Sequence, residues 1–230
     1  VAHNIPFEEG QHSHETILAA DEIVKSPGIP NSAPIIQSIQ KKGPPIIDDI
    51  ELANRYTQAF LIGITGTNGK TTTTHLTYHL LREAGLNVDM AGNMGKSFSR
   101  KVLENKHDYF VLELSNFQLE GMHTCKLAIA CLLNITPDHL DQYHGQMAPY
   151  LQAKFRILQN MTAQEYFIYN QEDSNIQAYL QQQTVLPCQH PISIQGCSTE
   201  VGACLSLLAA SHFKLQGLHN RFNALVAMKV

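Results

Sequence analysis

Short apolar runs alternate along most of this chain with stretches whose apolar residues recur at helical spacing. The run FLIGIT (60–65) predicts a buried strand, and we expect a helix from Lys70 to about Ala84, where Gly85 ends it. The same alternation predicts strands over 87–92, 109–114, 126–136 and 165–170 and a helix over 148–160. Strands that alternate with helices are typical of a parallel α/β sheet. The less regular segment 184–217 predicts edge or antiparallel strands in PISI and HFKLQG.

The first part of the chain repeats this pattern on a smaller scale. Short strands are expected at Ile23–Val24 and Ile46–Ile47, with a helix between them in APIIQSIQKKG that Gly43 closes. A further helical run follows in DDIELANRY. Two strands joined by a helix form a βαβ unit, which is only a piece of a sheet. We place a boundary near residues 56–59, so that an incomplete N-terminal domain (1–57) precedes a central domain (58–230).

Composition narrows the class of protein. The chain has 230 residues, of which 43% are hydrophobic and 16% charged, as in ordinary globular domains. A net charge of −4 gives no reason to expect a nucleic-acid or membrane partner, and we find no apolar run of membrane-spanning length. The five cysteines form no C-x-x-C pair, and Cys125 and Cys131 adjoin an apolar run. We therefore expect buried thiols in a reducing cytoplasm.

The segment ITGTNGKTTTT (64–74) carries the most specific chemistry. A strand leads into Gly66–Gly69 and a helix begins at Lys70, which points backbone N–H groups and a helix N-terminus at an anion. Lys70 can reach the β- and γ-phosphates of a nucleotide, and the Thr71 hydroxyl can bind Mg²⁺. The spacing departs from G-x-x-x-x-G-K-[ST], because Ile64 stands where the early glycine is expected. The alternative is a glycine-rich turn before an ordinary helix.

Two candidate metal ligands follow later strands of the predicted sheet. Glu113 ends the strand YFVLE, and His139 lies in the loop NITPDHLDQYHG (134–145) after the most apolar strand. Ligands of open α/β sheets bind at the carboxyl ends of the strands, so Glu113 can reach the same crevice as Lys70. His139 is a candidate metal ligand or substrate donor. A carboxylate that merely ends a strand and a structural or solvated histidine are the alternatives.

Three further residues are ambiguous by pattern alone. Lys154 in LQAKFRIL fits a solvated lysine on an amphipathic helix. Asn220 and Asn223 in GLHNRFNALVAM lie one helical turn apart, so they could read the edge of a purine through paired hydrogen bonds. Simple N-capping of the helix by Asn220 is the alternative.

Six motifs in this order resemble the Mur ligases, the ATP-dependent amide ligases of peptidoglycan precursor synthesis. They are GITGTNGKTT, GNMG, LELSNFQLE, LNITPDHLDQY, AKFRI and GLHNRFN. The displaced early glycine is typical of that family. LELSNFQLE, SPGIP (26–30) and DDIELANR (48–55) are most similar to the members that add D-glutamate, although Asn116 stands where a serine is usual. The resemblance implies an α/β fold: a partial Rossmann-like, UDP-binding N-terminal domain followed by a P-loop-type central domain with a mostly parallel sheet.

The resemblance also assigns roles to residues. ATP would be held by the loop and by an asparagine pair at the adenine, that is by Gly66, Thr67, Asn68, Gly69, Lys70, Thr71, Thr72, Asn220 and Asn223. Two Mg²⁺ sites would be formed by Thr71, Glu113, His139 and Lys154, with Lys154 carbamoylated so that it presents an anion. The UDP-muramoyl substrate would be contacted by Ser26, Asn93 and Ser115. Lys70, Glu113, His139 and Lys154 would be the catalytic residues.

The implied reaction joins D-glutamate to UDP-N-acetylmuramoyl-L-alanine through an acyl phosphate, with ATP as the phosphoryl donor. We find no counterpart of the first half of the family's N-terminal domain or of its D-glutamate-binding C-terminal domain, and the central domain would stop one turn into the HNRFN helix. The chain is therefore expected to be an inactive, monomeric fragment. A sister Mur-type or folylpolyglutamate-type ligase and a non-catalytic ATP-binding fragment remain as alternatives.

Overall fold

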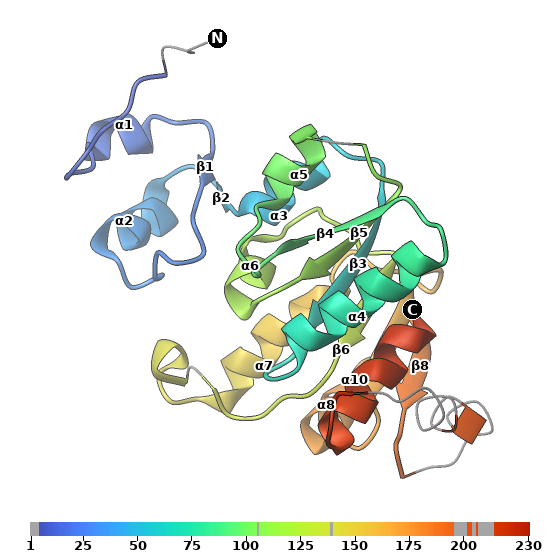
Figure 1. The fold of residues 1–230 in the computed structure, drawn as a ribbon. Helices are drawn as coiled ribbons and strands as arrows, with labels where there is room; N and C mark the ends of the chain where they lie inside the picture. Colours follow the sequence, from blue (N-terminus) through green and yellow to red (C-terminus); the bar gives the residue numbers. More distant parts are fainter. Residues whose placement is uncertain (1–4, 105, 139, 196–201, 204–205, 207–213) are drawn as a thin grey trace.

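A six-stranded parallel sheet forms the centre of the molecule (Figure 1). The computed structural model describes residues 5–104, 106–138, 140–195, 202–203, 206 and 214–230. The strand order is β4-β5-β3-β6-β7-β8, and every neighbouring pair is parallel. The strands are β3 (Phe60–Thr65), β4 (Val88–Gly92), β5 (Tyr109–Glu113), β6 (Ile129–Leu132), β7 (Tyr166–Asn170) and β8 (Cys188–Ile192). The predicted parallel α/β sheet is thus confirmed.

Two layers of helices cover the sheet. On one face α4 (Lys70–Glu83) and α10 (Leu218–Lys229) lie side by side (Figure 1) and enclose a core that includes Ile62, Ile64 and Phe222. The other face packs a larger core against five helices that contribute to it, which are α3 (Asp49–Asn54), α5 (Phe98–Glu104), α6 (Asn116–Gly121), α7 (Met147–Phe155) and α8 (Ser174–Leu180). Successive strand residues such as Leu61 and Ile62 point to opposite layers, as strand geometry requires.

The end of the sheet differs from expectation. β8 contains part of the segment that was expected to form edge or antiparallel strands. It is an edge strand, but it runs parallel to β7, with Tyr166 opposite Cys188. α8 crosses between the two strands and returns the chain to the same edge, which makes the pair parallel. The other candidate strand, HFKLQG, is not seen over 214–217, while 212 and 213 lie outside the described residues.

The N-terminal βαβ unit is confirmed in its elements. β1 (Ile23–Val24) and β2 (Ile46–Ile47) pair in parallel, and α2 (Pro34–Lys42) connects them. A short helix, α1 (His14–Leu18), precedes β1, and in Figure 1 these elements lie to one side of the large sheet. α3, which follows β2, packs instead on α5 and α6 and contributes to the larger core. The division at residue 57 stays a prediction.

The cysteines, the apolar character of the helices and the length of α10 can also be compared with the expectations from sequence. Cys125 and Cys131 are buried free thiols, and burial raises the pKa of Cys125 to about 12 and also raises that of Cys131. No helix in the described parts of the chain is long and apolar enough to span a bilayer. The HNRFN helix, α10, extends as far as Lys229, so the expectation that it stops after one turn is wrong.

Candidate active site

The glycine-rich segment forms a tight loop between β3 and α4. Gly69 is the N-cap of α4 with a left-handed φ of 86°, which favours glycine. The Lys70 ammonium lies across the loop, donating to Gly66 O at 2.9 Å and Thr67 O at 2.8 Å, and burial lowers its pKa. Thr71 is exposed and Thr72 half-buried in the first turn of α4. Loop and helix N-terminus therefore have the geometry of a phosphate site.

The segment after β6 fixes this loop from the side. Asn68 N donates to Asn134 Oδ1 at 2.8 Å, and Asn134 Nδ2 returns a bond to Asn68 O at 2.9 Å. The Thr67 hydroxyl donates to Thr136 O at 3.0 Å and lies 3.0 Å from the Tyr150 hydroxyl of α7. The sequence did not assign Asn134, Thr136 or Tyr150 these contacts. A polar run directly after a buried strand was the one signal that could have found the first two.

Glu113 lies at the end of β5, beside the loop, as expected. Its side chain is only 2% exposed, and Oε1 accepts a bond from Asn93 Nδ2 at 2.9 Å. Oε2 is buried and has no hydrogen-bond partner among the described residues. A buried carboxylate oxygen without a partner is costly unless a cation faces it. The donor chemistry therefore fits Mg²⁺, an ion that prefers carboxylate oxygen.

Lys154 is buried beside the same loop. It is 2% exposed, and Nζ donates to Gly66 O at 3.0 Å and lies 5.4 Å from the centre of the Tyr150 ring. Burial, together with the nearby Lys70 ammonium, lowers the pKa of Lys154 to about 7. The interpretation as a solvated lysine is wrong, because helical spacing cannot show what the end of a long side chain meets.

Of the asparagine pair of α10, Asn223 is brought to the loop, and its Nδ2 lies 3.4 Å from Asn220 Oδ1. α10 begins at Leu218, so Asn220 lies inside the first turn and donates from Nδ2 to Gln216 O at 2.8 Å. Simple N-capping by Asn220 is therefore wrong; the cap position belongs to Gly217. Asn223 is buried against Gly69, where a Cβ would lie 2.6 Å from its Oδ1. A cavity of about 470 Å³ lies beside this contact, between Gly69 and Phe222.

In the part of the chain that the structure describes, the remaining residues predicted for the site form no hydrogen bond to the phosphate loop. Ser115 is the buried N-cap of α6, and its hydroxyl donates to Gln118 Oε1 at 3.1 Å. Ser26 is exposed in the turn after β1, where its carbonyl accepts from Ile29 N. His139 lies outside the described residues, and within them no three His, Cys, Asp or Glu side chains gather around a common metal position.

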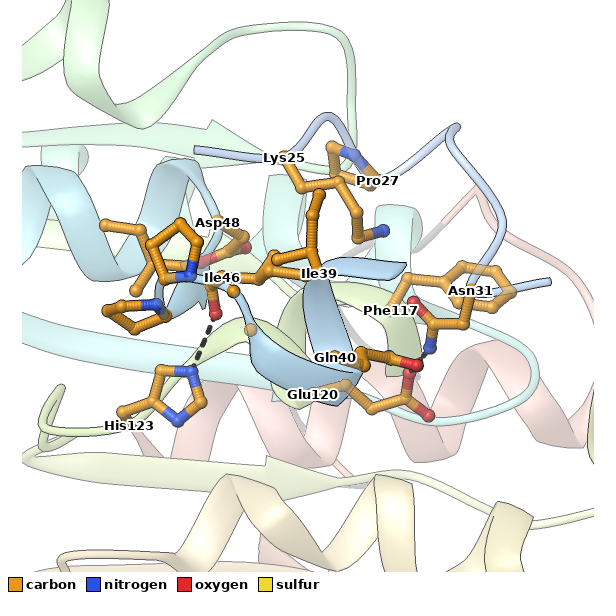
Figure 2. A pocket seen from close by; sticks show the side chains of 15 residues that line it. Lys25, Pro27, Asn31, Ile39, Gln40, Ile46, Asp48, Phe117, Glu120 and His123 are labelled. Carbon is orange, nitrogen blue, oxygen red and sulfur yellow. Dashed lines mark hydrogen bonds between the residues drawn. The ribbon is translucent and has the colours of Figure 1, made fainter. Parts of the chain in front are cut away.

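A second cavity separates the N-terminal unit from α6 (Figure 2). Its volume is about 480 Å³, and its lining includes Lys25, Asp48 and Glu120. Asn31 Nδ2 donates to Glu120 Oε2 at 3.1 Å across the junction, a bond drawn in Figure 2. Asp48 is 3% exposed, and burial raises its pKa to about 7.

The Mur ligase middle domain matches residues 64–230. The chain is 46% identical over 98% of its length to UDP-N-acetylmuramoylalanine–D-glutamate ligase of Bacteroides fragilis, and 41% identical over 96% to the protein of that name from Porphyromonas gingivalis. It covers 53% and 52% of those proteins, so it spans about half the length of the curated relatives it matches.

Solved structures show the same fold. One is UDP-N-acetylmuramate:L-alanyl-gamma-D-glutamyl-meso-diaminopimelate ligase from Neisseria meningitides, with a TM-score of 0.62 and 18% identity over 91% of this chain and 73% of that one. Another is a MurF ligase from Thermotoga maritima, solved in complex with ADP, with a TM-score of 0.53 and 18% identity over 80% of this chain and 50% of that one.

Proposed function

Because the chain belongs to the Mur ligase family, we propose that it carries the ATP-binding centre of a ligase that joins D-glutamate to UDP-N-acetylmuramoyl-L-alanine. The names of its relatives, at 41–46% identity, support this substrate pair over those of sister ligases. The observation that carries the proposal is the phosphate loop, with the buried Glu113 and Lys154 on either side of it. We further infer a monomeric enzyme of the cytoplasm.

The proposed reaction has two steps. A substrate carboxylate oxygen attacks the γ-phosphorus of ATP and ADP leaves, which gives an acyl phosphate. The amine nitrogen of D-glutamate then attacks the acyl carbon, phosphate leaves and the nitrogen loses a proton. Phosphorylation is needed because a carboxylate lacks a good leaving group. The protein contributes mainly orientation and charge neutralisation.

The residues of the loop divide this work. Backbone N–H groups of the loop would bind the phosphates, and the Lys70 ammonium, which lies across the loop, would neutralise the negative charge that develops on the leaving ADP. Thr71 and Glu113 would hold one Mg²⁺, and His139 and Lys154 would complete a second site. When bound, Mg²⁺ supplies positive charge to the phosphate oxygens. Asn220 and Asn223 would hold the adenine, and Ser26, Asn93 and Ser115 the UDP-muramoyl substrate.

The buried lysine supports a carbamate at position 154. A neutral amine attacks CO₂, an N–C bond forms and one proton leaves for solvent. Since burial and the Lys70 ammonium lower the pKa of Lys154 to about 7, the neutral amine that carbamoylation needs is available near neutral pH. The resulting anion would face the Lys70 ammonium and the cations of the site, which favour it.

Phosphate release by the complete polypeptide tests this function. We expect release only when ATP, UDP-N-acetylmuramoyl-L-alanine and D-glutamate are all present, and loss of release in Lys70→Ala. A requirement for another amino acid or for a folate would identify a sister ligase. Nucleotide binding without release under any of these conditions would favour a non-catalytic protein.

A further inference from the structure

The loop that carries Asn93 is attached at its first end to Glu113. Asn93 N donates to Glu113 O at 2.9 Å, and Gly92 N donates to Lys96 O at 2.9 Å, which closes the turn. Gly92 has a φ of 104°, and a Cβ there would lie 2.2 Å from Glu113 O. The backbone of β4 and that of β5 are therefore as close here as a glycine allows.

The second end of the loop is attached to Asp49, which comes from α3. The Asp49 carboxylate accepts bonds from Phe98 N at 2.6 Å, from the Ser97 hydroxyl at 2.9 Å and from Ser99 N at 3.3 Å. The first N–H groups of a helix have no partner within it, so this carboxylate satisfies the start of α5 from a distant part of the chain.

Asp49 is itself held rigidly. Its neighbour Ile50 is fully buried in the larger core, and Glu51 is 0% exposed. The Glu51 carboxylate accepts bonds from the backbone N–H groups of the turn 123–125. α3 is thus tied to the central domain by the two residues that directly follow Asp49, and the carboxylate makes a fixed support for the loop.

We propose that Asp49 is a positioning residue for the nucleotide–magnesium site, acting through Asn93. With both ends of the loop fixed, the Asn93 amide is aimed at Glu113 Oε1, which leaves the buried Oε2 as the oxygen without a hydrogen-bond partner among the described residues. A hydrogen bond to one carboxylate oxygen sets the direction of the other, and such partners commonly govern metal affinity. The inference rests on the proposed function, because it requires Mg²⁺ and nucleotide to bind at Glu113.

The test measures the affinity of the 230-residue chain for ADP by calorimetry, with and without Mg²⁺. Asp49→Asn removes the charge and presents an N–H group to the donors at the start of α5. We expect the Mg²⁺-dependent gain in ADP affinity to fall by about tenfold, which is the lower end of the loss in metal affinity when a metal ligand loses its hydrogen-bond partner. ADP binding without Mg²⁺ should be unchanged. Asn93→Ala should cause a similar loss, and the double variant no further loss, since both act on one contact.

Thr124→Val is the matched control. It removes the Thr124 hydroxyl bond to Glu51, which also anchors α3, but it does not touch the Asn93 loop. Ser97→Ala is a milder second variant, in case Asp49→Asn does not fold, and it should shift Mg²⁺ dependence in the same direction. Equal losses in Thr124→Val, or additive losses in the double variant, would show a merely structural role. Absence of Mg²⁺-dependent binding in the unaltered chain would instead refute the proposed function itself.

Discussion

Burial of charged side chains is the main result at the scale of single residues. Glu113 and Lys154 are 2% exposed, and Asp48 is 3% exposed. The sequence placed Glu113 at the end of a strand beside a phosphate loop, and sheet topology was sufficient to predict this position. Its role as a metal ligand stays a prediction. The sequence could not mark Asp48 or the burial of Lys154, because both depend on which distant segment covers them.

Lys154 provides the first prediction. Lys154→Ala should lower phosphate release by the complete polypeptide on the order of 100-fold or more, as loss of a preorganised charge in a dry site does. Lys154→Arg should not restore it, since arginine keeps a positive charge where a carbamate is proposed. A small carboxylic acid added to Lys154→Ala should recover part of the rate. Normal turnover in Lys154→Arg would mean that position 154 needs only a cation.

Asp48 provides a prediction for pH dependence. Its pKa is raised by burial from 3.8 to about 7, so the folded chain binds this proton more tightly than the unfolded chain does. The contribution to stability is therefore complete below about pH 4 and is lost as the pH rises through 7, to a limit on the order of 4 kcal/mol.

Asp48→Ser tests this contribution, because serine keeps the N-cap of α3 without the carboxyl group. Its free energy of unfolding, measured in urea, should rise relative to the unaltered chain between pH 5 and 8. Asp21→Ser, a change at an exposed position, is the control and should leave the profile unaltered. Parallel profiles for Asp48→Ser and the unaltered chain would contradict the raised pKa.

Elements with long, regular patterns were predictable, and several short helices of the central domain were not. The strands from β3 to β7 and the helices α4 and α7 were expected near their observed positions, because their apolar spacing extends over enough residues. The helices α5, α6 and α8 have 7, 6 and 7 residues, too few for a periodic signal. β6 covers only 129–132 of the expected 126–136, since residues 133–136 leave the sheet to hold the phosphate loop.

The junction of the loop and α10 gives a prediction at this scale. Gly69→Ala would place a Cβ 2.6 Å from Asn223 Oδ1, so we expect α10 to move away from the loop. ADP affinity should then fall about tenfold or more, because the loop and Asn223 are no longer aligned for binding. Gly85→Ala is a close control. Its φ of 85° matches the 86° of Gly69, but nothing lies within 4 Å of the added Cβ.

Both variants should lose about 1–2 kcal/mol of stability from the left-handed conformation alone. Only Gly69→Ala should also lose nucleotide affinity, which calorimetry with Mg²⁺ and ADP measures. Equal affinities in the two variants would mean that the contact between Asn223 and the loop has no part in binding.

At the scale of the whole molecule, α3 joins the central domain more closely than the pattern indicated. The sequence placed the boundary after α3, near residues 56–59, where the pattern of strands and helices starts again on a larger scale. Contacts that tie α3 to α5 and to the turn 123–125 come from residues 48 to 74 positions away in the chain, and no local pattern reports them. β1 and β2 form a separate two-stranded sheet, which is marginal by itself.

The rates of amide hydrogen exchange should therefore change between β2 and α3. Amides of α3 are expected to exchange as slowly as those of β5, because Ile50, Glu51 and Ala53 are buried in the central domain. Amides of β1 and β2 should exchange faster. Glu51→Gln leaves the buried backbone N–H groups of the turn 123–125 without a full set of acceptors, so it should lower the free energy of unfolding by about 1–3 kcal/mol. The amides of α3 should then exchange as fast as those of β1 and β2.

Arg55→Ala is the control for this change. Arg55 joins α3 to Glu22 by two bonds of 2.7 Å, but its side chain is 40% exposed, and exposed ion pairs contribute little. Exchange in Arg55→Ala should therefore match that of the unaltered chain. If α3 exchanges together with β1 in the unaltered chain, the helix belongs to the N-terminal unit. The bonds from Asp49 to α5 would then cross a mobile junction and could not fix the Asn93 loop.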